Sequence, residues 1–137
     1  MALNTLESKI KYRISRSKDD VFVLKDFDDL SGRDQVSRVL RSLVEKECLA
    51  KISRGMYAKT FVSEYTGRVV LNNSLPVLAW DGLKKLGVKV RESQALKDYN
   101  SGKSTQVPTG RLIGVEGRVT RKIEYNGNEI EYEYGSR

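Results

Sequence analysis

The stretch that decides the fold is SGRDQVSRVLRSLVEKECLAKISRGMYAK, residues 31–59. The apolar residues of its first half recur at the spacing of one buried helical face, at Val36, Val39, Leu40, Leu43 and Val44. The residues from 49 onward predict two short strands, and Gly55 supplies the left-handed backbone of the turn between them. A helix followed by a basic two-stranded hairpin is typical of winged helix-turn-helix domains, which contact DNA.

The residues before this stretch complete the same pattern. They predict, in chain order, a helix over 5–16 capped by Thr5, a strand over 21–24 and one helical turn over 28–30. Ser31 or Gly32 precedes the long helix, and Ser31 together with Asp34 fits the S-x-x-D/E capping pattern. The order of helix, strand, short helix, long helix and hairpin predicts a winged-helix DNA-binding domain over residues 1–60.

The remaining residues, 61–137, predict a small α+β unit that serves for dimerisation or partner contact. Its expected elements include a helix over 75–86, a strand over 111–115 and a hairpin of 122–125 with 129–134. Asn126-Gly127 between the last two segments is the strongest short-range hairpin signal. Trp80 keeps helical spacing with its apolar neighbours, so we expect it in the core. The whole chain is therefore predicted to be α+β, with an N-terminal winged helix-turn-helix followed by a small antiparallel β-sheet and helices.

The charge balance favours an anionic partner. The 137 residues contain 25 Lys and Arg against 18 Asp and Glu, a net charge of +7. Because phosphates supply most of the sequence-independent affinity of DNA-binding proteins, double-stranded DNA is the expected partner. The single cysteine, Cys48, excludes an internal disulfide and favours the cytoplasm, and we expect it to pack at the end of the long helix. The apolar runs are far shorter than the about 20 residues of a transmembrane helix, so no membrane contact is expected.

The first turns of the long helix carry the candidate base-reading side chains. Arginine pairs with guanine and glutamine with adenine in the major groove, and the candidates of this kind are Arg33, Gln35, Ser37 and Arg38. The candidate phosphate contacts come from the rest of the helix, the hairpin and a later loop, and they are Arg41, Ser42, Lys51, Ser53, Arg54, Tyr57 and Lys103. A core position is the alternative for Tyr57, and simple solvation is the alternative for Lys103.

The sequence gives little support for catalysis. Histidine, the commonest general base and metal ligand near neutral pH, is absent from the chain. Asp26, Asp28 and Asp29 form a carboxylate cluster of the kind that binds divalent ions in nucleases, but such a run before a helix also serves as turn and capping chemistry. We therefore expect a non-enzyme with no metal and no cofactor, and a metal-dependent nuclease remains the alternative.

Several motifs resemble one known family. Asp26-Phe27, the helix pattern R-D-x-V-x-R-x-L-x-x-L over 33–43 and the closing R-G-M-Y over 54–57 are similar to the winged-helix domain of AbiEi-type antitoxins of type IV toxin–antitoxin systems. Residues 104–109 resemble an S-T-Q-V-P segment of short relatives of that family. The resemblance implies an autorepressing transcriptional regulator encoded beside a nucleotidyltransferase-type toxin. This chain lacks the long C-terminal domain of the larger antitoxins, so the resemblance implies DNA binding more directly than toxin neutralisation.

Two classes of function therefore stay open. In the first, the protein is a sequence-specific repressor that binds operator DNA through residues 31–59, with a homodimer on paired half-sites as one arrangement. In the second, the winged helix is a protein-interaction or adaptor module of a mobile-element defence system and has no specific DNA binding. The steep salt dependence of phosphate contacts distinguishes the two.

Overall fold

The computed structural model describes residues 5–106 and 111–134, and the chain divides into two compact units, residues 1–73 and 74–137. We refer to them as unit 1 and unit 2. The sequence placed the boundary after residue 60. In the structure it comes later, because strand β3 (Met56–Val62) continues past residue 60 and pairs with β4 (Val69–Leu71). Residues 107–109 of the antitoxin-like segment lie outside the described residues.

The described residues of unit 1, 5–73, form three helical segments and one sheet. Besides β3 and β4, its elements are α1 (Leu6–Arg16), β1 (Val21–Val23), the 3-10 helix η1 (Leu24–Phe27), α2 (Arg33–Glu45) and β2 (Leu49–Ser53). The predicted order is confirmed, but the short helix lies at 24–27 and not at 28–30. The Asp26 carboxylate accepts the N–H of Val23 at 2.9 Å, which closes this turn directly after β1.

The two long helices of unit 1 begin differently. Thr5 caps α1 as expected, because its Oγ1 accepts the N–H of Ser8 at 3.1 Å. The cap of α2 is Gly32, whose extended backbone leads into the helix without a side-chain hydrogen bond. The predicted capping pair of Ser31 and Asp34 is therefore wrong, because the helix begins one residue too late for it. Asp34 still lies in the first turn, where the helix dipole favours a carboxylate.

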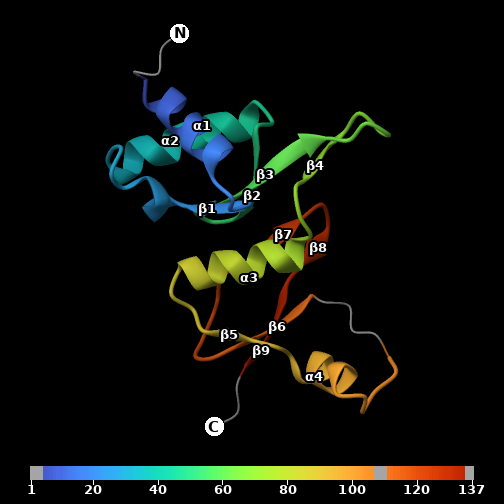
Figure 1. Ribbon diagram of the computed structural model, residues 1–137. Helices are drawn as coiled ribbons and strands as arrows, with labels where there is room; N and C mark the ends of the chain where they lie inside the picture. Colours follow the sequence, from blue (N-terminus) through green and yellow to red (C-terminus); the bar gives the residue numbers. More distant parts are fainter. Residues whose placement is uncertain (1–4, 107–110, 135–137) are drawn as a thin grey trace. The chain divides into compact units, whose positions relative to one another are not determined.

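The helices of unit 1 cover one face of its sheet (Figure 1). The core between them consists of the buried side chains of Ile10, Phe22, Phe27, Val36, Leu40, Leu43, Leu49 and Tyr57. Burial of a large apolar side chain contributes about 1.5 to 3 kcal/mol, so this cluster fixes α2 on the sheet. The predicted buried face of α2 is confirmed, with Val39 and Val44 packed at its margin.

β3 is the central strand of the unit 1 sheet. It pairs antiparallel with β1 and β2 and, further along, with β4. Phe22, Tyr57 and Lys51 lie opposite one another on these three strands. Residues directly opposite in an antiparallel sheet point to the same face. Lys51 therefore points to the face on which the helices pack.

α2 ends in a Schellman motif that leads into β2. The N–H of Cys48 donates to the carbonyl of Leu43 at 2.8 Å, and the N–H of Glu47 donates to Val44 at 3.0 Å. Glu47 adopts the left-handed backbone with a φ of 63°, a position that glycine usually occupies. Cys48 is exposed, so the expectation that it packs at the end of the helix is wrong: the reversed backbone turns it outward.

Unit 2 combines two helices with short strands. Its elements are α3 (Leu75–Lys85), β5 (Val90–Arg91), α4 (Gln94–Asn100), β6 (Leu112–Val115), β7 (Glu124–Tyr125), β8 (Asn128–Glu129) and β9 (Glu131–Tyr134). The predicted hairpin is confirmed, because β7 and β8 pair about Asn126 and Gly127, which both have positive φ. The α+β class is confirmed as well.

The sheet of unit 2 is mixed, and its expected antiparallel character is wrong for one pair of strands. β5 pairs antiparallel with β6, but β9 pairs parallel with β6. The predicted strand over 129–134 is interrupted at Ile130. The N–H of Ile130 donates to Ile123 at 2.9 Å, whereas that of Glu131 donates to Arg111 at 2.8 Å. The chain thus changes hydrogen-bonding partners between these two residues.

Arg91, Gly114 and Glu133 lie opposite one another across β5, β6 and β9. The Arg91 guanidinium donates to the Glu133 carboxylate at 2.8 Å, and the Gln94 N–H donates to the same carboxylate at 3.0 Å. A Cβ at position 114 would lie 2.6 Å from the Arg91 guanidinium. Glycine at 114 therefore lets the arginine cross the middle strand to reach its partner.

Candidate nucleic-acid interface

The outward side of α2 carries the candidate base-reading residues. Arg33, Gln35 and Arg38 are exposed, while Val36 and Leu40 of the same helix are buried. This follows from the helical period, which turns the positions beside the buried stripe toward solvent. Within the described parts of the chain, Arg33 and Arg38 form no ion pair, so their guanidinium groups are not neutralised by neighbouring carboxylates.

Tyr57 of the β2–β3 hairpin packs in the core together with residues of α2. Only 2% of its surface is exposed, and its hydroxyl forms a hydrogen bond with Ser37. Burial raises the pKa of Tyr57, while the nearby Arg41 and the Ser37 hydrogen bond oppose that shift. The predicted phosphate contact by Tyr57 is therefore wrong, because its burial in the core removes it from solvent. Ser37 is half-buried, and its hydroxyl is already used on Tyr57.

Lys51 and Arg41 approach Tyr57 from two different elements. Lys51 is the cross-strand neighbour of Tyr57 on the face toward the helices, and Arg41 of α2 interacts with the Tyr57 hydroxyl. Both cations are exposed. The helix and the hairpin therefore present positive charge on a common side, and the tyrosine is the structural link between them.

The turn of the β2–β3 hairpin adds one more cation. Arg54 and Gly55 form the turn, Arg54 is exposed, and Gly55 has the predicted positive φ of 72°. The predicted phosphate contact of Ser53 is wrong, because this residue is buried, with only 6% of its surface exposed. We call the exposed set the α2–hairpin surface, and it comprises Arg33, Gln35, Arg38, Arg41, Lys51 and Arg54.

Two other predicted phosphate contacts lie outside this surface. Ser42 is half-buried on α2. Lys103 belongs to unit 2, where its N–H donates to the Asp98 carbonyl after the end of α4 at 2.8 Å. Its side chain is exposed. The structure thus places Arg41 of the helix and Lys51 of the hairpin near Tyr57, whereas Lys103 belongs to the other unit.

α1 carries a cationic hollow that the sequence reasoning missed. Lys9, Tyr12, Arg13, Arg16 and neighbouring residues line a depression of about 480 Å³. The Arg16 guanidinium lies 5.7 Å from the centre of the exposed Tyr12 ring, within range of a cation–π contact. The i, i+3, i+4, i+7 spacing of these four residues is the sequence signal that would have grouped them on one helical face.

Two of the three aspartates before α2, Asp26 and Asp29, are engaged in structural contacts. Both carboxylate oxygens of Asp29 accept hydrogen bonds from Arg13, at 2.5 and 2.8 Å, and this contact lowers the pKa of Asp29. Asp26 closes η1, as described above. Over residues 5–106 and 111–134, no three His, Cys, Asp or Glu side chains are grouped so that they could hold a metal ion.

A profile of the family described as "Family of unknown function (DUF6088)" matches residues 6–136, which covers both units. The chain belongs to this family. No curated protein and no solved structure matches the DUF6088 chain at a significant level. Among the residues that the structure describes, no helix has the length and apolar character needed to cross a bilayer; α2, the longest, has 13 residues.

Proposed function

We propose that this DUF6088 protein is a winged-helix regulator that binds double-stranded DNA through the α2–hairpin surface. In this proposal α2 enters the major groove and the β2–β3 hairpin is the wing that follows the phosphate backbone. The order of α1, β1, η1, α2, β2 and β3 supports the winged helix. The net charge of +7 supports a polyanionic partner.

The observation that carries the proposal is the position of Arg41 and Lys51 beside the buried Tyr57. In a winged-helix arrangement, cations of the hairpin on the same side as the groove-bound helix add phosphate contacts that fix its position on the duplex. Tyr57 holds the two elements in that relation through its hydrogen bond with Ser37 and its place opposite Lys51. In this arrangement Arg33, Gln35 and Arg38 read base edges, while Arg41, Lys51 and Arg54 neutralise phosphates.

Within this proposal the protein is an autorepressing antitoxin that is encoded beside a nucleotidyltransferase-type toxin and acts in the cytoplasm. This role rests on the AbiEi-like motifs.

A second candidate function is that of an adaptor module without specific DNA binding. It is favoured by the exposed apolar side chains of the β3–β4 hairpin, where Phe61 is 49%, Val62 is 62% and Tyr65 is 97% exposed. An exposed apolar group of this kind is typical of a protein-interaction site.

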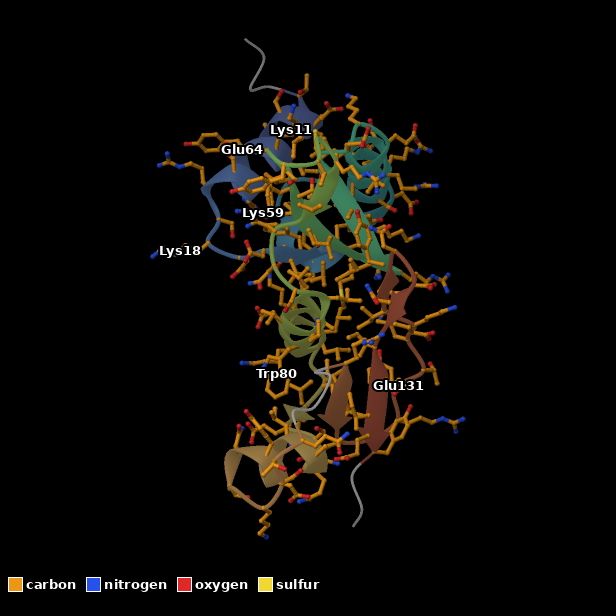
Figure 2. All side chains as sticks on the ribbon, turned by 90° about the vertical axis from the view of Figure 1, so that its right-hand side faces the viewer. Lys11, Lys18, Lys59, Glu64, Trp80 and Glu131 are labelled. Carbon is orange, nitrogen blue, oxygen red and sulfur yellow. The ribbon has the colours of Figure 1, made fainter. Side chains whose placement is uncertain are left out.

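The test is a salt titration of DNA affinity with the full chain and matched variants. Arg41→Ala and Lys51→Ala each remove one phosphate contact, so each should reduce the slope of log affinity against log salt by about 0.9. The control is Lys18→Ala, which removes the same charge from a residue that projects on the side of unit 1 away from α2 (Figure 2). If Lys18→Ala changes the slope as much as the other two variants, or if wild type binds no duplex, the proposed surface is wrong.

Base reading is tested on duplexes selected from a random pool by the wild-type chain. Gln35→Ala and Arg38→Ala should weaken binding to the selected sequence by about 1 to 3 kcal/mol and leave binding to random duplex nearly unchanged. Arg41→Ala should weaken both alike. Equal losses on selected and random DNA for Gln35→Ala and Arg38→Ala would contradict their base-reading role. A selection that yields no enriched sequence would favour the adaptor.

A further inference from the structure

Unit 2 contains a half-open cavity that the DNA-binding proposal does not use. It has a volume of about 390 Å³ and lies between α3, α4 and the strands β5 and β6. Val77 and Trp80 of α3, Leu96 of α4, and Leu112 and Ile113 of β6 form its apolar wall. Figure 2 shows that Trp80 extends from α3 toward α4. The expected core position of Trp80 is therefore corrected: its ring is half-exposed because it lines this cavity.

The polar side chains at the cavity are already bonded within unit 2. Arg91 donates to Glu133 at 2.8 Å, and the Ser93 hydroxyl accepts the Leu96 N–H at 3.2 Å. The Glu92 carboxylate accepts the side-chain amide of Asn100 at 3.1 Å. The positive charge of Arg91 is thus paired with Glu133, whereas the exposed Glu92 keeps a negative charge that disfavours an anionic occupant. Transfer of a charged group into such a site is costly.

We infer that this cavity is a binding site for a neutral, apolar small molecule with one or two aromatic groups. Small-molecule sites have volumes of about 300 to 1,000 Å³ and mostly apolar walls, and this cavity lies at the lower end of that range. The indole of Trp80 gives an aromatic occupant an offset-stacked or edge-to-face contact. A neutral occupant is favoured because the wall is mostly apolar and the charge of Arg91 is paired with Glu133. This site is independent of the proposed DNA surface, because every residue of its wall belongs to unit 2.

The fluorescence of Trp80 allows binding in the cavity to be measured directly. This residue is the only tryptophan in the chain, so the tryptophan emission of the full-length protein reports on the cavity wall. The probe is N-phenyl-1-naphthylamine, a neutral compound of two linked aromatic groups, naphthyl and phenyl, whose absorption overlaps tryptophan emission. Titration should give a saturable decrease of Trp80 emission, a matching rise of probe emission and a stoichiometry of one probe per chain. Non-saturable quenching, or a stoichiometry well above one, would overturn the inference.

The variant Val77→Glu tests binding in the cavity without disturbing the fold. Val77 is 43% exposed and lies three residues after Ser74, the cap of α3. A carboxylate in the first turn is favourable to the helix dipole, and at this position it lies on the cavity wall. We expect probe affinity to fall by about tenfold or more, with the circular dichroism spectrum unchanged.

The matched control is Val62→Glu, which introduces the same charge at an exposed valine of β3 in unit 1. This variant should bind the probe like wild type. Equal affinity of Val77→Glu and wild type, or equal losses in both variants, would overturn the inference. The probe affinity should also be measured over the range of protein concentrations in which the chain self-associates. If the affinity falls as the protein concentration rises, a second copy of the chain occupies the cavity, and the inference is overturned.

Discussion

Replacing Glu47 by glycine should stabilise the protein. Glu47 has a φ of 63° at the end of α2, and its N–H and that of Cys48 close the Schellman motif. The left-handed conformation costs an L-residue with a Cβ about 1 to 2 kcal/mol, a cost that glycine does not have. Glycine increases the entropy of the unfolded chain, which costs about 0.4 to 1 kcal/mol. The expected net gain for Glu47→Gly is therefore about 0.5 to 1 kcal/mol.

Urea denaturation followed by circular dichroism measures this gain. With a denaturant dependence of about 2 kcal/mol per molar urea, the midpoint should rise by about 0.3 to 0.5 M. Removal of the negative charge near the C-terminal end of α2 also contributes, because the helix dipole disfavours a carboxylate there. Glu47→Gln separates the two effects, since it keeps the Cβ and removes the charge. A smaller gain is expected for this control.

Two outcomes would refute the reasoning. If Glu47→Gln raises the midpoint as much as Glu47→Gly, the effect is electrostatic and the backbone conformation contributes nothing. If Glu47→Gly lowers the midpoint, the side chain stabilises the turn more than its conformation costs. Either result would remove the backbone of Glu47 as the weak point of the connection between α2 and β2.

Two further predictions concern titration in unit 2. The hydrogen bonds from Arg91 and the Gln94 N–H hold the pKa of Glu133 below its ordinary value, so its contribution to stability is present above about pH 4.3 and is lost as the pH falls through the lowered pKa. The variant Glu133→Gln should therefore be less stable than wild type at pH 7, and it should lose less stability when the pH is lowered. Urea denaturation midpoints measured from pH 7 to 2.5 test this. Parallel pH profiles of the two proteins would contradict it. Burial raises the pKa of Tyr132 from 10.0 to about 12, so its contribution is complete below pH 10 and is lost as the pH rises through 12. Tyr132→Phe, which removes a 2.6 Å hydrogen bond to the Arg121 carbonyl, should cost about 1 kcal/mol at pH 7 and flatten the alkaline limb of the same measurement.

Local patterns in the sequence predicted local structure well. The spacing of Val36, Leu40 and Leu43 identified the buried face of α2, and Gly55 and Asn126-Gly127 identified two turns by their need for positive φ. These features depend on neighbouring residues alone. For the same reason the positions of Arg33, Gln35 and Arg38 on the outside of α2 followed from the sequence.

Features that depend on distant segments could not be predicted. The parallel pairing of β9 with β6 is decided by which edge of the sheet is open, and alternation in residues 129–134 carries no information about that. The burial of Tyr57 depends on its contact with Ser37 on another element. Similarly, the exposure of Trp80 to a cavity depends on the gap between α3 and α4, which no helical periodicity reveals.

The geometry around Gly114 also limits how relatives of this protein can diverge. A Cβ at this position would lie 2.9 Å from the Arg91 carbonyl oxygen as well as against its side chain, so a shorter residue at 91 would not be enough to admit alanine at 114. Strands β5 and β6 would have to separate. Family members with a larger residue at 114 should therefore have substituted Arg91 and Glu133 too, and should pair these strands in a different register or not at all.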